Sequence, residues 1–347
     1  MRKIGAFLVI MILLPCVITV FMSGIDRGSK QGAKEQQVKV KRDTKESEDK
    51  FSRDKDEDYE FVLWEDYLLG ILAANIPVDY ELEAMKAQVV LLRSQAAMQL
   101  AGKTDDADKQ SPVPDEQVTM PETDAVLSGN YLTMEEMKSH WNADELKKYM
   151  KKYKKAMQET KREVLTFQEG IAYTPFHNLS TGATRNGAEV LESDAYPYLI
   201  SVDCSADKEA KDAMQMFTFS YEEVKAKCQP FLVAVEKDEA DKEFVFADFE
   251  ITGTDAAGYV MTLNIAGNAY QGEQFRQALH LPSSAFVLQD YKGELRITTT
   301  GRGHGIGMSQ WTANEMAKEG ASYSEILSYF FPETTIQKDD EIFLKLE

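Results

Sequence analysis

The stretch that decides the fold reads Gly301-Arg302-Gly303-His304-Gly305-Ile306-Gly307-Met308-Ser309-Gln310-Trp311. Glycine costs backbone entropy, so four glycines at every second position indicate a sharp bend or a close backbone approach. Nucleotide loops need the spacings G-x-G-x-x-G or G-x-x-x-x-G-K-[ST], and neither occurs here. The nucleophile motif G-x-S-x-G fails because Trp311 takes its last place. Two interpretations stay open: a glycine-lined site presenting His304 and Gln310, or a tight strand-to-helix corner with a solvated histidine.

The start of the chain has the pattern of a signal anchor over residues 1–23. Arg2 and Lys3 precede an uncharged, largely aliphatic run at residues 5–22, close to the roughly 20 residues that span a bilayer. No clean small-residue cleavage site follows, and the positive flank predicts a cytoplasmic N-terminus. Residues 24–58 are charged and poor in aliphatic residues, which is typical of a tether. We therefore expect a single-pass cell-membrane protein with an extracytoplasmic globular domain. Whether the segment is cleaved stays open.

Composition excludes some partners. The chain of 347 residues has 39 basic and 58 acidic side chains and a net charge of −19, which argues against nucleic acid and allows a neutral polymer. Cys204 and Cys228 could form a disulfide in an exported domain, or could stay as buried free thiols. No metal-binding spacing such as C-x-x-C or H-E-x-x-H occurs, so we expect neither a metal nor a cofactor.

The periodicity predicts an α+β fold in residues 59–347, with helices at both ends around a strand-rich middle. A first apolar helix over residues 62–74 ends at Pro77, and a second, capped by Asp79, runs to about Leu100. Residues 103–129 indicate an exposed loop. Thr133 and Asn142 begin helical segments, the second amphipathic with a lysine-rich outer face that is most simply solvated.

Strand and helix signals alternate after Glu163. Ser309 and Ser322 are predicted to cap two closing helices, the second stopped by Pro332. The predicted strands cover residues 164–167, 171–173, 231–233, 244–246, 259–263 and 295–300.

Taken together, the sequence resembles the stage II sporulation protein D family, which is related to the amidase-enhancer proteins. Four patches carry the resemblance, which covers about residues 62–335: residues 82–89 (LEAMKAQV) with Arg93, residues 176–182 (FHNLSTG) with 197–199 (PYL), residues 275–283 (FRQALHLPS), and residues 301–310 with 316–317, Gly320 and 323–331. The resemblance implies a groove between lobes, a single N-terminal anchor, and peptidoglycan remodelling while the forespore is engulfed. It also implies glycan strands as substrate and an amidase or other engulfment protein as partner.

The activity implied by the resemblance is that of a lytic transglycosylase, a murein hydrolase type that cleaves between N-acetylmuramic acid and N-acetylglucosamine without water. One carboxylic acid protonates the glycosidic oxygen, and its conjugate base then assists the muramyl 6-hydroxyl, in contrast to the two-carboxylate scheme of ordinary glycosidases. The side chains expected to contact substrate in this chain are Arg93, His177, Arg276, His304, Ser309 and Gln310. For Arg93, an internal ion pair is an equally supported alternative.

The chain departs from the family at the catalytic acid. The family carries a glutamate just before the Met-Pro or similar pair that ends the first helix, and here that run reads Ile71-Leu72-Ala73-Ala74-Asn75-Ile76-Pro77. The carboxamide of Asn75 can hold a sugar hydroxyl but does not ionise in the working range. Because acid–base catalysis contributes about 10²–10⁴-fold, we expect activity lowered at least that far or abolished, as in a pseudoenzyme.

Two alternatives to a glycan-binding, catalytically weak protein stay open. An active transglycosylase could use a displaced acid, either a nearby carboxylate or His304, whose ordinary pKa is about 6.5. Among the nearby carboxylates, Asp79 has a simpler predicted task as a helix cap, and Glu81 and Glu83 have one at the helix dipole. The other alternative is a purely structural membrane protein.

Overall fold

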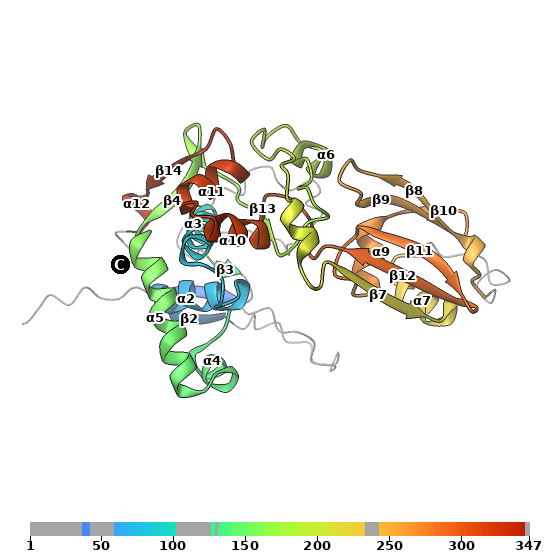
Figure 1. Ribbon diagram of the computed structural model, residues 1–347, viewed down its shortest axis with the longest axis horizontal. Coiled ribbons are helices and arrows are strands. Elements are labelled where there is room, and N and C mark those ends of the chain that lie inside the picture. Colours follow the sequence, from blue (N-terminus) through green and yellow to red (C-terminus); the bar gives the residue numbers. More distant parts are fainter. Residues whose placement is uncertain (1–36, 42–58, 102–125, 129–130, 233–242, 344–347) are drawn as a thin grey trace, which may run out of the picture.

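The computed structural model describes residues 37–41, 59–101, 126–128, 131–232 and 243–343, and these form an α+β fold as predicted. Figure 1 shows a helix-rich lobe and a strand-rich lobe, joined by a middle region that contains α6, β13 and long connecting segments. The run at residues 5–22 lies outside the described residues. Within the described part, no helix has the length and apolar character needed to cross a membrane.

The helix-rich lobe is built around α3 (Leu82–Leu100), which packs against α2, α5, α10, α11 and β4. Apolar residues on every side of α3 are buried, which is what a central helix requires. The other elements of this lobe are β1 (Gln37–Lys41), β2 (Tyr59–Leu63), α2 (Trp64–Asn75), β3 (Val126–Ser128), α4 (Met134–His140), α5 (Ala143–Glu159), β4 (Glu163–Phe167), β5 (Gly170–Ile171), α10 (Gln310–Lys318), α11 (Tyr323–Phe330), β14 (Thr335–Lys338) and α12 (Asp340–Phe343).

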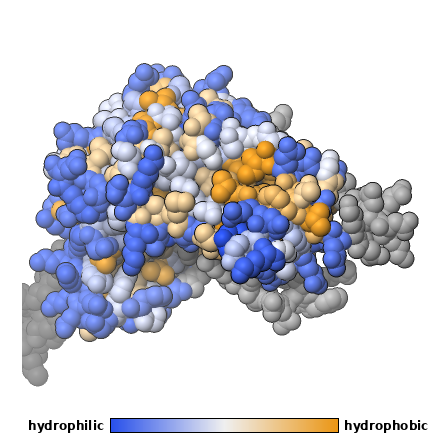
Figure 2. Space-filling view, turned by 45° about the vertical axis from the view of Figure 1, so that its right-hand side comes forward, coloured by the Kyte–Doolittle hydropathy of each residue, from blue (hydrophilic) through white to orange (hydrophobic). Residues whose placement is uncertain are grey.

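The strand-rich lobe has its own hydrophobic core, centred on Phe275, Leu263 and Ile297. Its two antiparallel sheets have the orders β11-β12-β7 and β10-β9-β8. The elements are β7 (Met214–Phe219), α7 (Tyr221–Cys228), η2 (Phe246–Asp248), β8 (Phe249–Thr254), β9 (Val260–Ile265), β10 (Asn268–Gln271), α9 (Gly272–Ala278), β11 (Phe286–Tyr291) and β12 (Glu294–Thr300). The space-filling view shows apolar side chains gathered on this lobe (Figure 2), where Met214, Met216 and Val287 are exposed.

Short elements occupy the middle region between the lobes. The strands β6 (Phe176–His177) and β13 (Met308–Ser309) pair in parallel, and β13 leads directly into α10. The short helix α6 (Gly187–Leu191) and the 3-10 helix η1 (Ser205–Glu209) lie in the connection between β6 and β7. This region therefore brings the start of α10 next to the residues that follow β6.

The predicted tether over residues 24–58 was wrong at Gln37–Lys41. These residues form β1, the central strand of a sheet with the order β2-β1-β3. Val38 and Val40 alternate with lysines, and both valines are buried in the core of the helix-rich lobe. The predicted exposed loop over residues 103–129 was likewise wrong at β3, where Leu127 is fully buried. The remaining residues of both segments lie outside the described ones.

The predicted caps of four helices were confirmed. Thr133, Asn142 and Ser322 each form a capping box, and Ser309 accepts the N–H of Thr312 at the start of α10. The cap assigned to Asp79 was wrong, because α3 begins after Glu81, whose backbone N–H donates to the Asn314 side chain at 2.7 Å.

Two of the predicted strands were also wrong. Phe231 and Leu232 continue from α7 as a turn, and Phe246 begins η2. Residue 233 lies outside the described ones.

Replacing Val40 by alanine tests whether β1 belongs to the folded domain. Its side chain is fully buried, so Val40→Ala should lower the free energy of unfolding by about 2 kcal/mol through lost apolar contacts and a residual cavity. Phe61→Ala on β2 is the control, because Phe61 is 66% exposed and a surface substitution changes stability by about 0.5 kcal/mol or less. Equal, small effects in urea unfolding would show that β1 is not part of the cooperative core.

Candidate functional site

The glycine-rich segment is held in a backbone conformation that side chains rarely adopt. Gly301, Gly303, Gly305 and Gly307 have φ angles of +77°, +104°, +80° and +71°. A Cβ at Gly303 would lie 2.7 Å from the His177 Cβ, one at Gly305 would lie 2.5 Å from the Tyr259 hydroxyl, and one at Gly307 would collide with the Pro175 carbonyl. Both sterics and left-handed geometry therefore require glycine here.

The backbone of this segment connects both lobes with the middle region. Arg302 and Leu179 exchange two backbone hydrogen bonds at 2.8 and 3.0 Å, Gly301 donates to Ala213, and Gly303 donates to Pro282. Further along, the Gly305 carbonyl accepts the Arg185 N–H, and Met308 donates to Pro175. The segment is thus a sharp corner that joins separate parts of the chain, as one of the two interpretations of the motif expected. The solvated histidine of that interpretation is not found, because His304 is only partly exposed.

Gln310 lies at the centre of an amide network at the start of α10. Its side-chain nitrogen donates to the Asn75 backbone carbonyl at 2.8 Å and to Gln88 Oε1 at 2.9 Å, and its oxygen accepts from Asn178 Nδ2 at 2.7 Å. Gln88 is fully buried and Gln310 is 1% exposed. The network therefore connects the C-terminal end of α2 with three of the four sequence patches, those at residues 82–89, 176–182 and 301–310.

Asn75 is the last residue of α2, and its side chain is engaged with its own helix. Its Nδ2 donates to the Ile71 carbonyl at 2.7 Å, one turn earlier in the helix. A carboxylate could not make this bond, since it has no donor when ionised. The negative end of the helix dipole also disfavours an anion at this position, so an acid here would hold its proton more strongly than in water.

The partly exposed surface beside Asn75 combines an aromatic ring with polar groups. Trp311, on the first turn of α10, meets Tyr80 edge-on at 6.4 Å between ring centroids. Burial, then the charges of Asp79, Asp207 and Glu315, raise the pKa of Tyr80 to about 12, so its hydroxyl keeps its proton. An aromatic face with neighbouring hydrogen-bonding groups is a common composition for a ligand site.

Asp207, in η1, was missed by the sequence reasoning. Its carboxylate is fully buried and accepts hydrogen bonds from the Ser309 hydroxyl at 2.8 and 2.9 Å, the Thr312 hydroxyl at 2.6 Å and the Ser180 backbone N–H at 2.6 Å. Its position at the N-terminus of α10 suits an anion. One aspartate in a polar stretch gives no periodic signal, so the sequence alone could not single it out.

Ser309 is buried and fully engaged in structure. Besides capping α10, its hydroxyl donates to Asp207, and its exposed fraction is zero. The predicted substrate contact of Ser309 would therefore be indirect, through the position that it gives to α10.

Arg93 and Arg276 also serve internal contacts. Arg93 is 3% exposed, and its guanidinium donates to the carbonyls of Thr160 at 2.6 Å and Glu163 at 3.0 Å, just beyond the end of α5. A direct glycan contact is thus not expected for Arg93, because its guanidinium is engaged inside the protein. The Arg276 guanidinium forms a bidentate ion pair with Glu273 on the same helix and donates to the Leu281 carbonyl.

His304, in the glycine-rich segment, lies beside His177 of β6, with ring centroids 5.8 Å apart. Burial lowers the pKa of His177 to about 4, although its Nδ1 bonds to the Ile306 carbonyl. The pKa of His304 falls to about 3, first through burial and then through the nearby charges of His177, Arg185 and Arg276. Both rings are therefore neutral near pH 7, which argues against His304 as the source of the catalytic proton.

A buried ion pair joins the middle region to the strand-rich lobe near these histidines. Arg185 Nε lies 2.5 Å from Asp255 Oδ2, its Nη1 donates to the His304 carbonyl, and its guanidinium stacks 4.5 Å from the centroid of the Tyr259 ring. Asp255 lies between β8 and β9 of the strand-rich lobe. The pair therefore fixes the glycine-rich corner relative to that lobe.

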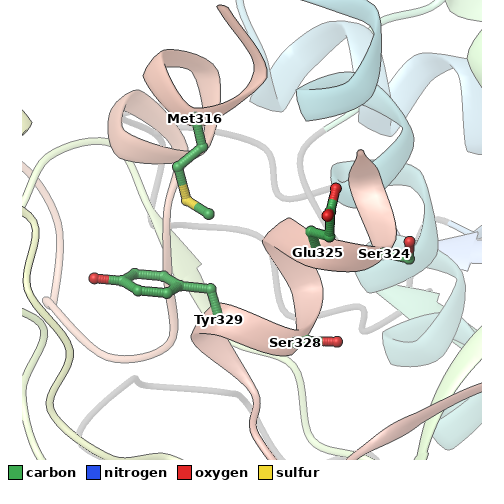
Figure 3. Close-up of a pocket in the computed structure, with 5 residues that line it drawn as sticks. All are labelled: Met316, Ser324, Glu325, Ser328 and Tyr329. Carbon is green, nitrogen blue, oxygen red and sulfur yellow. The ribbon is translucent and has the colours of Figure 1, made fainter. Parts of the chain in front are cut away.

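An open pocket lies away from this site, between α10 and α11. Met316 and Tyr329 point toward one another across it, with Glu325 nearby (Figure 3). Its remaining lining residues are Ser324 and Ser328, so no side chain expected to bind substrate lines it. The predicted groove between lobes is not this pocket.

The two cysteines of the globular part, Cys204 and Cys228, are separate buried thiols. Cys204 and Cys228 are both free, which decides between the two alternatives that the sequence left open. Burial raises the pKa of each thiol to about 12, so neither is a reactive thiolate near neutral pH.

Comparisons with known proteins agree with the family resemblance of the sequence. The family model of the stage II sporulation protein matches residues 53–167. Stage II sporulation protein D of Bacillus subtilis is 31% identical over 277 residues, which cover 80% of this chain and 75% of that protein. The protein of the same name in Bacillus amyloliquefaciens is 29% identical over 281 residues, 81% of this chain and 76% of the relative. The chain belongs to the stage II sporulation protein D family.

A more distant similarity links the chain to the amidase enhancer of Bacillus subtilis. The two are 25% identical over 321 residues, which cover 78% of this chain but 40% of the enhancer. This relationship was also expected from the sequence.

Gly307→Ala should unfold the corner. The left-handed backbone costs about 1–2 kcal/mol and the clash with the Pro175 carbonyl about as much again, so we expect a loss of about 3 kcal/mol. Gly293→Ala is the matched control, because its φ is +80° and a Cβ there meets nothing within 4 Å. Thermal unfolding of both variants measures the difference, and equal losses would contradict a steric requirement at Gly307.

His177 should make the protein sensitive to acid. The folded-state pKa of about 4 lies below the ordinary 6.5, so the unfolded chain binds more protons and stability falls as the pH drops from about 6.5 to 4. The difference corresponds to about 3 kcal/mol. In His177→Gln this pH dependence should become flatter in urea unfolding, whereas His140→Asn, on the exposed end of α4, should leave it unchanged. An unchanged profile in His177→Gln would overturn the assignment.

Proposed function

We propose that this protein is a membrane-anchored, peptidoglycan-binding member of its family that acts in cell-wall remodelling during engulfment, with weak or absent transglycosylase catalysis. The observation that carries the proposal is the carboxamide of Asn75 at the position of the family acid, within an otherwise intact frame. Its partners are glycan strands and, by resemblance, an amidase or another engulfment protein. The amidase enhancer among the related proteins supports this part of the proposal.

The chemistry supports loss of catalysis more directly than loss of binding. Proton transfer needs a group that gives and takes a proton, which Asn75 does not supply. Hydrogen bonding to sugars needs only donors and acceptors on a partly exposed surface, and Asn178, Arg302 and Trp311 remain partly exposed there. A protein of this kind would hold glycan strands and position or stimulate a partner that cuts the wall.

The second candidate function is an active transglycosylase that uses Asp79 as a displaced acid. The observation in its favour is that Asp79 is exposed and does not cap α3. Its charge acts on Tyr80, so it lies near the Trp311 surface. Against it, Asp79 is exposed to solvent, whereas a catalytic site usually excludes water from the reacting groups.

Restoring the acid separates these functions. Asn75→Glu should gain anhydromuramyl product release from purified sacculi by about 10²-fold or more over the native chain, because acid–base catalysis is worth about that factor. Asn75→Gln is the control of equal length without an ionisable group and should gain nothing. Mass spectrometry of the digest gives the measurement.

Two further results decide the proposal. In the first, the native chain releases abundant anhydromuramyl products that Asp79→Asn does not release. This result would establish Asp79 as the displaced acid and overturn the proposal of weak or absent catalysis. Co-sedimentation with sacculi tests binding, and a native chain that stays in the supernatant would refute glycan binding.

A further inference from the structure

The outer face of α5 carries a concentrated positive charge. At about 100° per residue, five lysines of this helix fall within an arc of about 120°. All five are exposed: Lys147, Lys148, Lys151, Lys154 and Lys155. We call these five residues the lysine face. The chain as a whole has a net charge of −19, so this face has the opposite sign to most of the protein.

Packing fixes the direction of the lysine face. On the other side of α5, Tyr153 and Ala156 are buried in the core of the helix-rich lobe. Lys152, between the two faces, donates to the carbonyls of Val78 and Tyr80. Because these contacts prevent rotation of the helix, the five lysines form a permanent surface of the lobe.

Few acidic residues of α5 itself lie close enough to neutralise the lysine face. Asp144 shares the arc at the first turn, and Glu159 at the last turn lies 3.7 Å from Lys155 but 2.5 Å from Lys86, on α3. Exposed charges attract an anionic surface at low salt and are screened at high salt. The face is therefore suited to an extended anionic surface, more than to a neutral polymer.

The strand β1 brings this lobe close to the N-terminal apolar run. Residue 22 ends that run and Gln37 begins β1, so only residues 23–36 separate them. Even if fully extended, these residues reach at most about 50 Å. β1 packs with α2, and α2 packs with α5. A chain anchored through residues 5–22 thus keeps α5 within reach of the bilayer.

We infer that the lysine face docks the helix-rich lobe on the anionic phospholipid headgroups of the membrane that anchors the chain. The inference rests on the anchor in the proposed function. Basic residues near an anionic leaflet each add to its attraction, and two weak membrane contacts act together when one chain links them. Docking would hold the lobe in one orientation, with a defined side toward the wall.

The full chain in lipid nanodiscs tests this inference. Discs with phosphatidylglycerol are compared with discs of phosphatidylcholine alone, and an amine-reactive acetylating reagent reports lysine access by mass spectrometry. We expect acetylation of the lysine face to fall by roughly threefold or more in anionic discs and to recover near 0.5 M salt, where charges are screened. Lys208 and Lys211, exposed in the middle region, are internal controls and should not change.

A variant removes the charge without changing the fold. Lys147, Lys148, Lys151, Lys154 and Lys155 are replaced by glutamine, and Lys208→Gln with Lys211→Gln serves as control. Energy transfer from the tryptophans to a dansyl-labelled headgroup should drop in the first variant only, because Trp64, Trp141 and Trp311 all lie in the helix-rich lobe.

The outcomes distinguish the inference from the anchor on which it rests. A chain that does not enter the discs would refute the anchor. A chain that enters but shows equal acetylation in both lipids would refute docking alone. Protection by soluble poly(glycerol phosphate), with none by anionic lipid, would assign the face to a wall polymer and also overturn the inference.

Discussion

The structure depends on four left-handed glycines in one short segment. Because Gly301, Gly303, Gly305 and Gly307 all have positive φ, the backbone can bend without clashing against Pro175, His177 and Tyr259. The bend exposes N–H and carbonyl groups in directions that a regular strand would not offer. The loop after β6, the strand-rich lobe and the entry to α10 each bond to this segment. Without this bend, the start of α10 would not be fixed in place, and the amide network around Gln310 could not form.

Under the proposed function, the site keeps the framework of a catalytic centre in which Asn75 takes the place of the acid. Gln310 still holds the end of α2, and the buried Asp207 still fixes the start of α10. The carboxamide of Asn75 turns back onto its own helix, so the exchange satisfies a local hydrogen bond as well as removing an acid.

The sequence predicted those parts of the fold that rest on local rules. The capping boxes at Thr133, Asn142 and Ser322 and the amphipathic stripe of α5 depend on neighbouring residues only. β1 was missed because two alternating valines within a charged stretch are too weak a signal without the strands that flank them. The Asp79 cap failed because α3 begins after Glu81, whose backbone N–H donates to Asn314, a residue far along the chain.

The sequence motifs of the site could be predicted, whereas the contacts of its side chains could not. Resemblance identified Asn75 and the glycine-rich stretch. It could not tell that Arg93 and Ser309 are buried, because polar residues are buried only when distant partners satisfy them. Asp207 gave no signal for the same reason: its partners Ser180, Ser309 and Thr312 come together only in the folded chain.

The central place of β1 in its sheet has a mechanical consequence. β1 pairs on one side with β2 and on the other with β3, and it follows the N-terminal segment directly. A pull along that segment would load both hydrogen-bonded ladders in shear, so that many bonds resist together and do not open one at a time. The folded domain would then resist tension at the strand where that tension enters.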